Sequence, residues 1–282
     1  MTFSELYKDC RKKLSHETAD FDLSQLFKGY FNEYNQIIKA DAEVEPQDAF
    51  IMQMKVKRLS EGYPLQYLLG EWEFYGLPVK VGEGVLIPRP DTETIVDTAL
   101  EIAAEIQDPV IADLCAGSGA IALAMAANLP HAKLYAVELS NDALSYLKQN
   151  IALNHLEDQI TVLQADVTGA LPLPKLDMLI SNPPYIRHED IEGLSVQVGY
   201  EPTMALDGGT DGLYFYRSIT AKALNLLKPQ GSLIFEAGYD QAEDIMDILK
   251  DHGYTDIDYR LDLNKIKRCV YAKAPEANEA SL

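Results

Sequence analysis

Asn182-Pro183-Pro184-Tyr185 is the stretch of this sequence whose residue types most directly suggest chemistry. Pro183 and Pro184 fix two φ angles and remove two backbone N–H groups, so the turn offers mainly acceptors. These acceptors are the Asn182 side-chain oxygen and the backbone carbonyls beside it, and Tyr185 adds a flat ring. Such a set suits a planar –NH2 group, which has two donors and a flat face. The turn predicts a site that holds an amide or amino nitrogen while an electrophile is transferred to it.

A glycine-rich segment, residues 113–119, is the second stretch that could bind a ligand. It reads Asp113-Leu114-Cys115-Ala116-Gly117-Ser118-Gly119, between an expected strand at 110–114 and an expected helix at 120–128. Small residues let the backbone approach a ligand closely, and a helix N-terminus supplies unpaired N–H groups. The spacing is not the G-x-G-x-x-G of a dinucleotide fold, and no lysine follows as in a P-loop. By itself the segment is only weak support for a nucleotide-type cofactor.

Acidic residues follow two further expected strands. Glu138 ends the strand at 133–137, about 20 residues past the glycine turn, where a carboxylate can accept two hydrogen bonds from a ribose diol. Asp166 and Val167 follow the strand at 160–164, and the Asn-Pro-Pro-Tyr turn follows a strand at 176–180. In open α/β sheets, ligands bind at the carboxyl edge of the strands. We therefore expect all four features to meet at one edge of a sheet.

The elements that must position these residues form two patterns. From residue 109 onward, strands and helices alternate, which predicts a parallel sheet covered on both faces. This pattern continues with a helix at 211–227, a strand at 232–236, a helix at 241–252 and a closing strand pair at 257–259 and 269–272.

Residues 1–65 instead carry apolar side chains at three- and four-residue steps, which predicts a small bundle of three helices. Ser4 is the expected N-cap of the first helix, the apolar residues of the second run from Leu23 to Ile38, and the third starts near Pro46. A β-hairpin over 71–81 and a helix from about 92 to 106, capped by Asp91 or Thr92, would follow.

Composition limits the classes of protein to consider. The formal net charge of -20 disfavours a nucleic-acid partner, because non-specific binding to phosphates depends on Lys and Arg. No apolar run reaches the roughly 20 residues that span a bilayer, and the N-terminus lacks a signal-peptide pattern. Three widely separated cysteines fit a reducing cytoplasm, and neither they nor the five histidines have a metal-ligand spacing. We expect a cytoplasmic protein without a metal site.

The motifs together resemble the class I S-adenosylmethionine-dependent methyltransferases, and more narrowly the PrmC/HemK family of peptide chain release factor glutamine N-methyltransferases. The resemblance covers nearly the whole chain. It is carried by the segments Ile87-Pro88-Arg89-Pro90-Asp91-Thr92-Glu93, Asp113 to Gly119, Ser181 to Ile186, Tyr200-Glu201-Pro202 and Leu206-Asp207-Gly208-Gly209. One departure is Cys115-Ala116, where many members have Gly-Thr; a pair of small residues should still leave room for the cofactor.

The resemblance implies a seven-stranded, mostly parallel class I sheet and assigns its site residues. S-adenosylmethionine would lie against the turn with Asp113, Cys115, Ala116, Gly117, Ser118 and Gly119, its ribose on Glu138, and its adenine between Asp166 and Val167, with Asn182 also close. The substrate glutamine would be held by Asn182, Pro183, Pro184 and Tyr185, with Arg89 and Glu201 as further substrate-binding residues. Asn182, Pro183 and Tyr185 would be catalytic, and no strong general base is expected.

The resemblance further implies four segments and a partner. These are a helical bundle for substrate recognition at 1–68, a linking hairpin at 69–86, the methyltransferase domain at 87–275 and a flexible tail at 276–282. The substrate would be the glutamine of the Gly-Gly-Gln loop of bacterial class I release factors, and the product S-adenosylhomocysteine. We expect a monomer that binds neither membrane nor nucleic acid directly.

Three alternatives share part of this pattern. A glutamine methyltransferase of a ribosomal protein would have the same chemistry and would differ mainly where this chain has Pro90-Asp91-Thr92-Glu93. A nucleic-acid adenine methyltransferase needs base flipping and a basic track, which the net charge disfavours. The third is a non-catalytic cofactor-binding or adaptor protein, which the apparently complete site disfavours.

Overall fold

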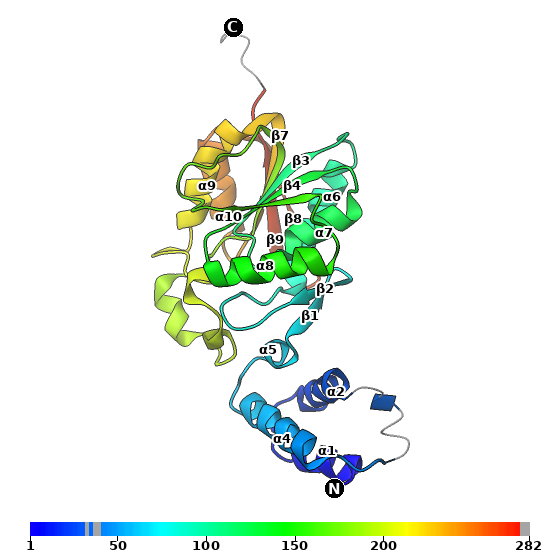
Figure 1. Ribbon diagram of the computed structural model, residues 1–282. Helices are drawn as coiled ribbons and strands as arrows, with labels where there is room; N and C mark the ends of the chain where they lie inside the picture. Colours follow the sequence, from blue (N-terminus) through cyan, green and yellow to red (C-terminus); the bar gives the residue numbers. More distant parts are fainter. Residues whose placement is uncertain (32–33, 36–40, 277–282) are drawn as a thin grey trace. The chain divides into compact units, whose positions relative to one another are not determined.

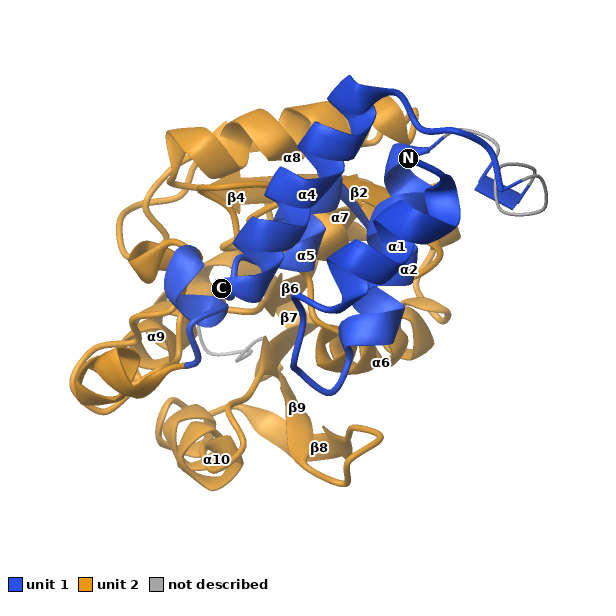
Figure 2. Ribbon diagram, turned by 90° about the horizontal axis from the view of Figure 1, so that it is seen from below, with its two compact units in different colours: residues 1–72, 195–200 blue, residues 73–194, 201–282 orange. Residues whose placement is uncertain are grey.

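The computed structural model describes residues 1–31, 34–35 and 41–276, and the chain divides into two compact units (Figure 2). Unit 1 comprises Met1–Trp72 and Ser195–Tyr200, and unit 2 comprises Glu73–Leu194 and Glu201–Leu282. The roles expected for segments 1–68, 69–86 and 87–275 stay predictions. Of the expected tail, 277–282 lie outside the described residues.

Unit 1 is helical, as the apolar periodicity predicts. Its described helices are α1 (Phe3–Arg11), α2 (Ala19–Tyr30), α4 (Pro46–Ser60) and α5 (Leu65–Leu69). Aromatic rings meet edge to face in its core: the centroid of Phe27 lies 5.2 Å from that of Phe3 and 5.0 Å from that of Tyr7. Such pairs stabilise a core beyond the area they bury.

Two details of unit 1 differ from the predictions. The N-cap of α1 is Thr2 and not Ser4, because Thr2 and Glu5 form a reciprocal capping box while the Ser4 N–H donates to Asp41 Oδ1. The short helix α5, which ends at Gly70 with a left-handed φ of 81°, was not predicted. The third helix begins at Pro46 as predicted, and Ile38, the expected end of the second apolar pattern, lies outside the described residues.

Unit 2 contains a seven-stranded sheet in the order β5-β4-β3-β6-β7-β9-β8. Its strands are β3 (Val110–Leu114), β4 (Lys133–Glu138), β5 (Ile160–Gln164), β6 (Leu176–Ser181), β7 (Leu227–Glu236), β8 (Thr255–Leu261) and β9 (Lys267–Lys273). Strands β3 to β7 are parallel, and β9 runs antiparallel to both β7 and β8. The predicted mostly parallel class I sheet is confirmed. Strands β7, β8 and β9 are longer than predicted because their pairing extends past the apolar runs from which they were recognised.

Helices cover both faces of this sheet (Figure 1). They are α6 (Glu93–Ala103), α7 (Ala120–Asn128), α8 (Asn141–Leu153), α9 (Tyr214–Leu226) and α10 (Ala242–Asp251). Helices α6 and α7 pack on one side of the sheet, and α9 and α10 pack together on the other. The sheet therefore lies between two layers of helices.

Two helix starts differ from the predictions. A 3-10 turn, Pro90–Thr92, precedes α6, and the Thr92 side chain does not cap the helix because its hydroxyl accepts a hydrogen bond from Asn182. Helix α9 begins at Tyr214 and not at Asp211. The Asp211 carboxylate accepts the Leu213 N–H and pairs with Arg217, which makes Asp211 part of the turn before the helix.

The hairpin is present as β1 (Glu71–Phe74) and β2 (Leu77–Lys80). Tyr75 and Gly76 between them both have positive φ, as a type I′ hairpin turn requires. After β6, the chain forms 3-10 turns at His188–Gly193, Val198–Tyr200 and Thr203–Ala205 that were not predicted. In the described part of the chain, no helix combines the length and apolar character needed to cross a bilayer.

Candidate active site

The carboxyl ends of β3, β4, β5 and β6 open into one cavity of about 270 Å³, close to the small end of ligand pockets. Its lining brings together residues from all four sequence features. The predicted residues that line it are Cys115, Ala116, Gly117, Ser118, Glu138, Asp166, Val167, Asn182, Pro184 and Arg89. The predicted residues Asp113, Gly119, Pro183, Tyr185 and Glu201 do not line it. Asp113 precedes the lining residue Cys115 by two positions, and the other four are sequence neighbours or hydrogen-bond partners of lining residues.

The glycine turn owes its tight shape to left-handed backbone at Cys115, Gly117 and Gly119, with φ of 61°, 57° and 87°. At Gly119, a Cβ atom would lie 2.4 Å from Leu147 Cδ1, so only glycine fits. Cys115 holds a conformation that costs a non-glycine residue about 1–2 kcal/mol. A glycine at this position would avoid this cost. Burial raises the pKa of the Cys115 thiol, which is therefore protonated.

Asp113 lies beneath the turn. Its side chain is 1% exposed, and its Oδ2 accepts the Ala122 N–H at 3.1 Å in the first turn of α7. Among the described residues, its Oδ1 has no hydrogen-bond partner. Burial raises the pKa of this carboxyl to about 8. Asp113 thus supports the helix that follows the glycine turn and does not face the cavity.

Glu138 closes the next wall, and its carboxylate is already partly used. Its Oε2 accepts the Gly117 N–H at 2.8 Å, and its Oε1 accepts the Leu139 and Ser140 N–H groups at 2.7 and 2.8 Å. A carboxylate offers about four lone-pair directions. Glu138 therefore links the glycine turn to the end of β4 and keeps capacity for about one further donor, fewer than the two expected from the sequence.

Asp166 and Val167 form the third wall. The Asp166 Oδ1 accepts both the hydroxyl and the N–H of Thr168 at 2.7 Å, and the hydroxyl bond in particular lowers the pKa of the carboxyl. Val167 is buried and lines the cavity beside Phe215. This wall therefore combines an ionised acid with apolar side chains, a mixture that suits a nucleoside.

The Asn-Pro-Pro-Tyr turn presents acceptors, as its residue types predict. Asn182 lines the cavity, its Nδ2 donates to the Thr92 hydroxyl at 3.4 Å, and its Oδ1 has no hydrogen-bond partner among the described residues. The Pro183 carbonyl receives no hydrogen bond from any described residue. The Ser181 hydroxyl donates to the Leu114 carbonyl at 2.8 Å and so ties the end of β6 to the end of β3. Two acceptors are thus available on a rigid strand end.

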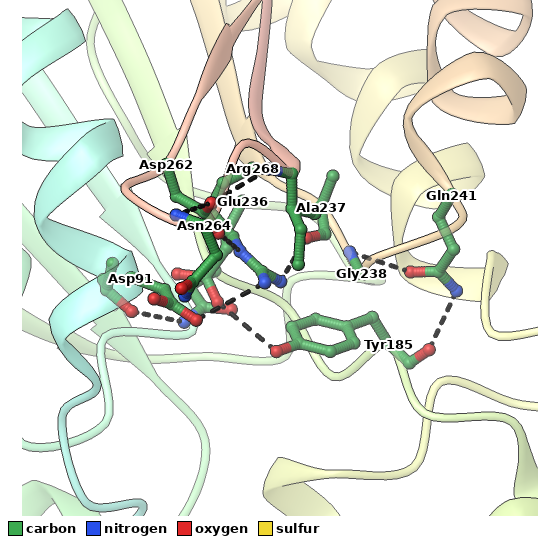
Figure 3. A network of polar contacts seen from close by, with 12 residues as sticks. Asp91, Tyr185, Glu236, Ala237, Gly238, Gln241, Asp262, Asn264 and Arg268 are labelled. Atoms are coloured by element: carbon green, nitrogen blue, oxygen red, sulfur yellow. Dashed lines mark hydrogen bonds and ion pairs between the residues drawn. The ribbon is translucent and has the colours of Figure 1, made fainter.

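Tyr185 does not line the cavity. Its hydroxyl donates to Glu236 Oε1 at 3.4 Å, and its backbone carbonyl accepts from Gln241 Nε2 at 2.9 Å (Figure 3). Burial raises the pKa of its phenol, which stays protonated. Its expected packing against a substrate amide stays a prediction.

The segment Leu206–Gly209 supports the turn from behind. Leu206 and Gly209 carbonyls accept the N–H groups of Ile186 and His188, and the Gly208 N–H donates to the Ile186 carbonyl. A Cβ atom at Gly208 would lie 2.7 Å from the Tyr185 Cα. Glycine at 208 thus lets one backbone lie directly against the other.

Arg89 and Glu201 form an ion pair at the cavity rim. Glu201 is 5% exposed, and its carboxylate bonds to the Arg89 guanidinium and accepts the Ile87 N–H at 3.0 Å. Arg89 lines the cavity, whereas Glu201 is occupied by these partners. Glu201 therefore anchors the loop that carries Arg89, and its expected contact with substrate stays a prediction.

Sequence reasoning missed the polar network behind the turn. Arg268 pairs with Asp262 at 3.1 Å and Asp91 at 3.4 Å and donates to the Ala237 carbonyl, while Glu236 receives the Tyr185 hydroxyl (Figure 3). Thr92 was assigned only as a possible helix cap. Glu236 had the same signal as Glu138, a carboxylate at the end of a predicted strand, and could have been found by it.

Comparison with known proteins shows which sequences this chain is similar to. Residues 94–198 match the family model of the methyltransferase small domain. A release factor glutamine methyltransferase of Fusobacterium nucleatum is 40% identical over 225 residues, which cover 79% of this chain and 63% of that protein. One of Moorella thermoacetica is 42% identical over 217 residues, 77% of each chain.

Solved structures agree in fold. The hMettl16 catalytic domain, crystallised with an RNA hairpin, superposes with a TM-score of 0.58 at 15% identity, covering 83% of this chain and 84% of that one. A methyltransferase from Pyrococcus furiosus gives 0.51 at 15% identity, covering 71% and 90%. These similarities show the class I methyltransferase fold alone. The sequence identity to the relatives from Fusobacterium nucleatum and Moorella thermoacetica shows more than the fold. This chain belongs to the release factor glutamine methyltransferase family.

Proposed function

We propose that this chain transfers a methyl group from S-adenosylmethionine to the side-chain amide nitrogen of the glutamine in the Gly-Gly-Gln loop of class I release factors. The transfer would support translation termination. The observation that carries the proposal is the pair of free acceptors on the Asn-Pro-Pro-Tyr turn, the Asn182 oxygen and the Pro183 carbonyl, at the end of the strand that borders the cavity. The names of the relatives support the choice of release factor as substrate.

The residues of the cavity fit S-adenosylmethionine. The backbone of Ala116 and Gly117 lines the cavity without bulky side chains, Glu138 has room for a ribose hydroxyl, and Val167 with Phe215 supplies apolar surface for adenine. When bound, S-adenosylmethionine supplies a methyl group on a positively charged sulfur, and S-adenosylhomocysteine is the product. The acids Glu138 and Asp166 place negative charge around this cavity.

The protein's main task is to orient a poor nucleophile, since an amide lone pair is delocalised into its carbonyl. The Asn182 oxygen and the Pro183 carbonyl each accept one N–H of the substrate amide, which fixes the direction of its nitrogen. Holding reactants in such a geometry contributes up to about 7–11 kcal/mol in the best cases. Pro184 lines the slot, and no residue removes a proton before transfer.

Arg89 and the helical bundle serve the larger substrate. Arg89, held by Glu201 at the rim, contacts the backbone of the incoming loop. Unit 1 exposes Phe50 and Met54 on one face of α4, a surface for a second region of the release factor. The enzyme works as a monomer in the cytoplasm. Light scattering of the purified protein would check the monomeric state.

The experiment is mass spectrometry of unmethylated release factor after incubation with the enzyme and S-adenosylmethionine. We expect one added methyl group on the Gly-Gly-Gln glutamine, and at least a hundredfold lower rate for Asn182→Ala with cofactor affinity within threefold of wild type. Asn128→Ala, on the exposed end of α7, is the matched control. Methylation of ribosomal protein or of adenine in nucleic acid, with none of the release factor, would replace the proposed substrate.

A further inference from the structure

One turn of the cavity wall, at residues 202–205, has no part in the reaction as described. Pro202, Met204 and Ala205 of this turn line the cavity, and all three are apolar. Met204 is also 58% exposed. A side chain that lines a cavity and is more than half exposed lies at the mouth of that cavity. The turn therefore places a long apolar side chain at the opening.

This combination of exposure and position is uncommon in the chain. Single exposed apolar side chains are normal on a protein surface. Of the large apolar side chains that are exposed in the described part of the chain, however, only Leu139 and Met204 line the cavity. Leu139 directly follows Glu138, on the wall proposed for the cofactor ribose. Met204 instead precedes Leu206–Gly209, the segment that supports the Asn-Pro-Pro-Tyr turn, and so belongs to the substrate side.

The backbone that carries Met204 is fixed on both sides. Glu201, directly before the turn, is buried and bonds to Arg89. The Leu206 carbonyl, directly after the turn, accepts the Ile186 N–H at 2.9 Å. A methionine side chain is unbranched and has three rotatable bonds. The wall is therefore held in place, while the Met204 side chain can adapt to a bound group.

A glutamine side chain needs two kinds of surface. Its amide N–H groups need acceptors, which Asn182 and Pro183 offer. Its two methylene groups are removed from water most favourably by apolar surface. Met204 supplies such surface at the mouth of the cavity, and a thioether has no N–H or O–H that could compete for the two acceptors.

We propose that Met204 is a substrate-binding residue that packs on the methylene groups of the glutamine and thereby favours glutamine over asparagine. This inference rests on the proposed function, because it requires the substrate amide to be held by Asn182 and Pro183. Asparagine has one methylene group fewer, so it offers Met204 less apolar surface. One methylene group in an apolar pocket changes selectivity by about 10- to 200-fold. The contact is the same before and during transfer, so its loss should raise KM and leave kcat unchanged.

The test is steady-state methylation of a short Gly-Gly-Gln peptide, with a Gly-Gly-Asn peptide as competitive inhibitor. We expect Met204→Ala to raise the KM for the glutamine peptide at least fivefold, with kcat within threefold of wild type. The inhibition constant of the asparagine peptide should exceed this KM about tenfold in wild type and less than threefold in Met204→Ala. Met204→Leu keeps the apolar surface and should stay within twofold of wild type. Leu261→Ala is the matched control, because Leu261 is 51% exposed and does not line the cavity.

Calorimetry with S-adenosylmethionine completes the test. The Kd for the cofactor should stay within threefold of wild type in Met204→Ala. A rise of more than fivefold, with the KM for the peptide unchanged, would place Met204 on the cofactor wall and overturn the inference. A KM within twofold of wild type, or an unchanged ratio of the inhibition constant to KM, would overturn it as well.

Asn182→Ala in the same assay identifies which proposal fails. This variant should lose kcat, whereas Met204→Ala should lose only peptide affinity. If Asn182→Ala keeps the wild-type kcat, the amide clamp itself is wrong. If Asn182→Ala is inactive while Met204→Ala behaves as wild type, only the role of Met204 is wrong.

Discussion

At the scale of single residues, one chemical group performs different tasks around the cavity. Glu138 lines it and binds three backbone N–H groups, Glu201 anchors Arg89, Asp113 supports a helix, and Glu236 accepts the Tyr185 hydroxyl. All four are carboxylates at or near the sheet edge. The burial of each carboxylate and its hydrogen-bond partners, and not its residue type, therefore decide what it does in the protein.

Asp113 leads to a pH-dependent prediction. Its pKa is raised by burial from an ordinary 3.8 to about 8, so between these values the folded state keeps a proton that the unfolded state has lost. Its contribution to stability is complete below about pH 4 and is lost as pH rises through about 8. Asp113→Asn does not titrate and keeps an acceptor for the Ala122 N–H.

We therefore expect wild type to lose stability relative to Asp113→Asn by roughly 1 kcal/mol for each pH unit between pH 5 and 8. Urea unfolding of both proteins at four pH values measures this difference. Two stability curves that stay parallel over this range would mean that Asp113 is ionised in the folded protein.

At the scale of elements, the site depends on backbones that lie against each other. The Asn-Pro-Pro-Tyr turn has few N–H groups of its own, and it is held by Leu206–Gly209, by Gln241 and by the end of β3. Gly208 is the closest of these supports, because any side chain there would meet Tyr185 Cα and the Pro184 carbonyl within 2.9 Å. The position of the Asn-Pro-Pro-Tyr turn is thus set by a loop that follows it in the chain, Leu206–Gly209.

Gly208→Ala should displace the turn without touching the glycine-rich wall. We expect kcat/KM to fall 10- to 100-fold, since a misplacement of about 1 Å can cost a hundredfold in rate. Cofactor affinity, measured by calorimetry, should stay within threefold. Gly193→Ala is the control, because a Cβ atom there meets nothing within 4 Å. Equal activity of both variants would show that the turn does not depend on this contact.

At the scale of the whole molecule, the chain combines an acidic surface with two compact units. The net charge of -20 disfavours a nucleic-acid substrate. A protein partner would then be selected by the shape of the contact surface and by apolar contacts. Unit 1 has its own aromatic core and exposes Phe50 and Met54 one helical turn apart on α4. Exposed large apolar side chains of this kind mark a possible surface for a partner.

Phe50→Ala with Met54→Ala tests this surface. We expect the KM for intact release factor to rise at least fivefold, while kcat and the KM for a short Gly-Gly-Gln peptide stay unchanged, because the peptide reaches only the cavity. Steady-state kinetics with both substrates measures the split. An equal rise of KM for the peptide would mean that the substitutions also disturb the cavity, and a fall of kcat with both substrates would indicate a loss of folded enzyme. No rise for either substrate would remove α4 from the recognition surface.

The sequence by itself determined the features that depend on neighbours along the chain. The alternation of strands and helices, the glycine turn, Glu138, Asp166 and the Asn-Pro-Pro-Tyr turn were all recognisable because strand ends, tight turns and prolines act locally. Their meeting at one edge follows from the parallel sheet, which the alternating pattern predicts. The helix limits at Thr2 and Tyr214 were missed because single side-chain hydrogen bonds decide them.

Only the tertiary structure decided which groups meet across the fold. Thr92 and Asn182 are 90 residues apart in the chain, Arg89 and Glu201 are 112 apart, and Tyr185 and Glu236 are 51 apart. No local rule links such positions, since their contact depends on strand order and on the path of the loops between strands. Tertiary packing therefore decided that Asp113 and Glu201 are occupied by the protein itself, and that Glu236 accepts the Tyr185 hydroxyl.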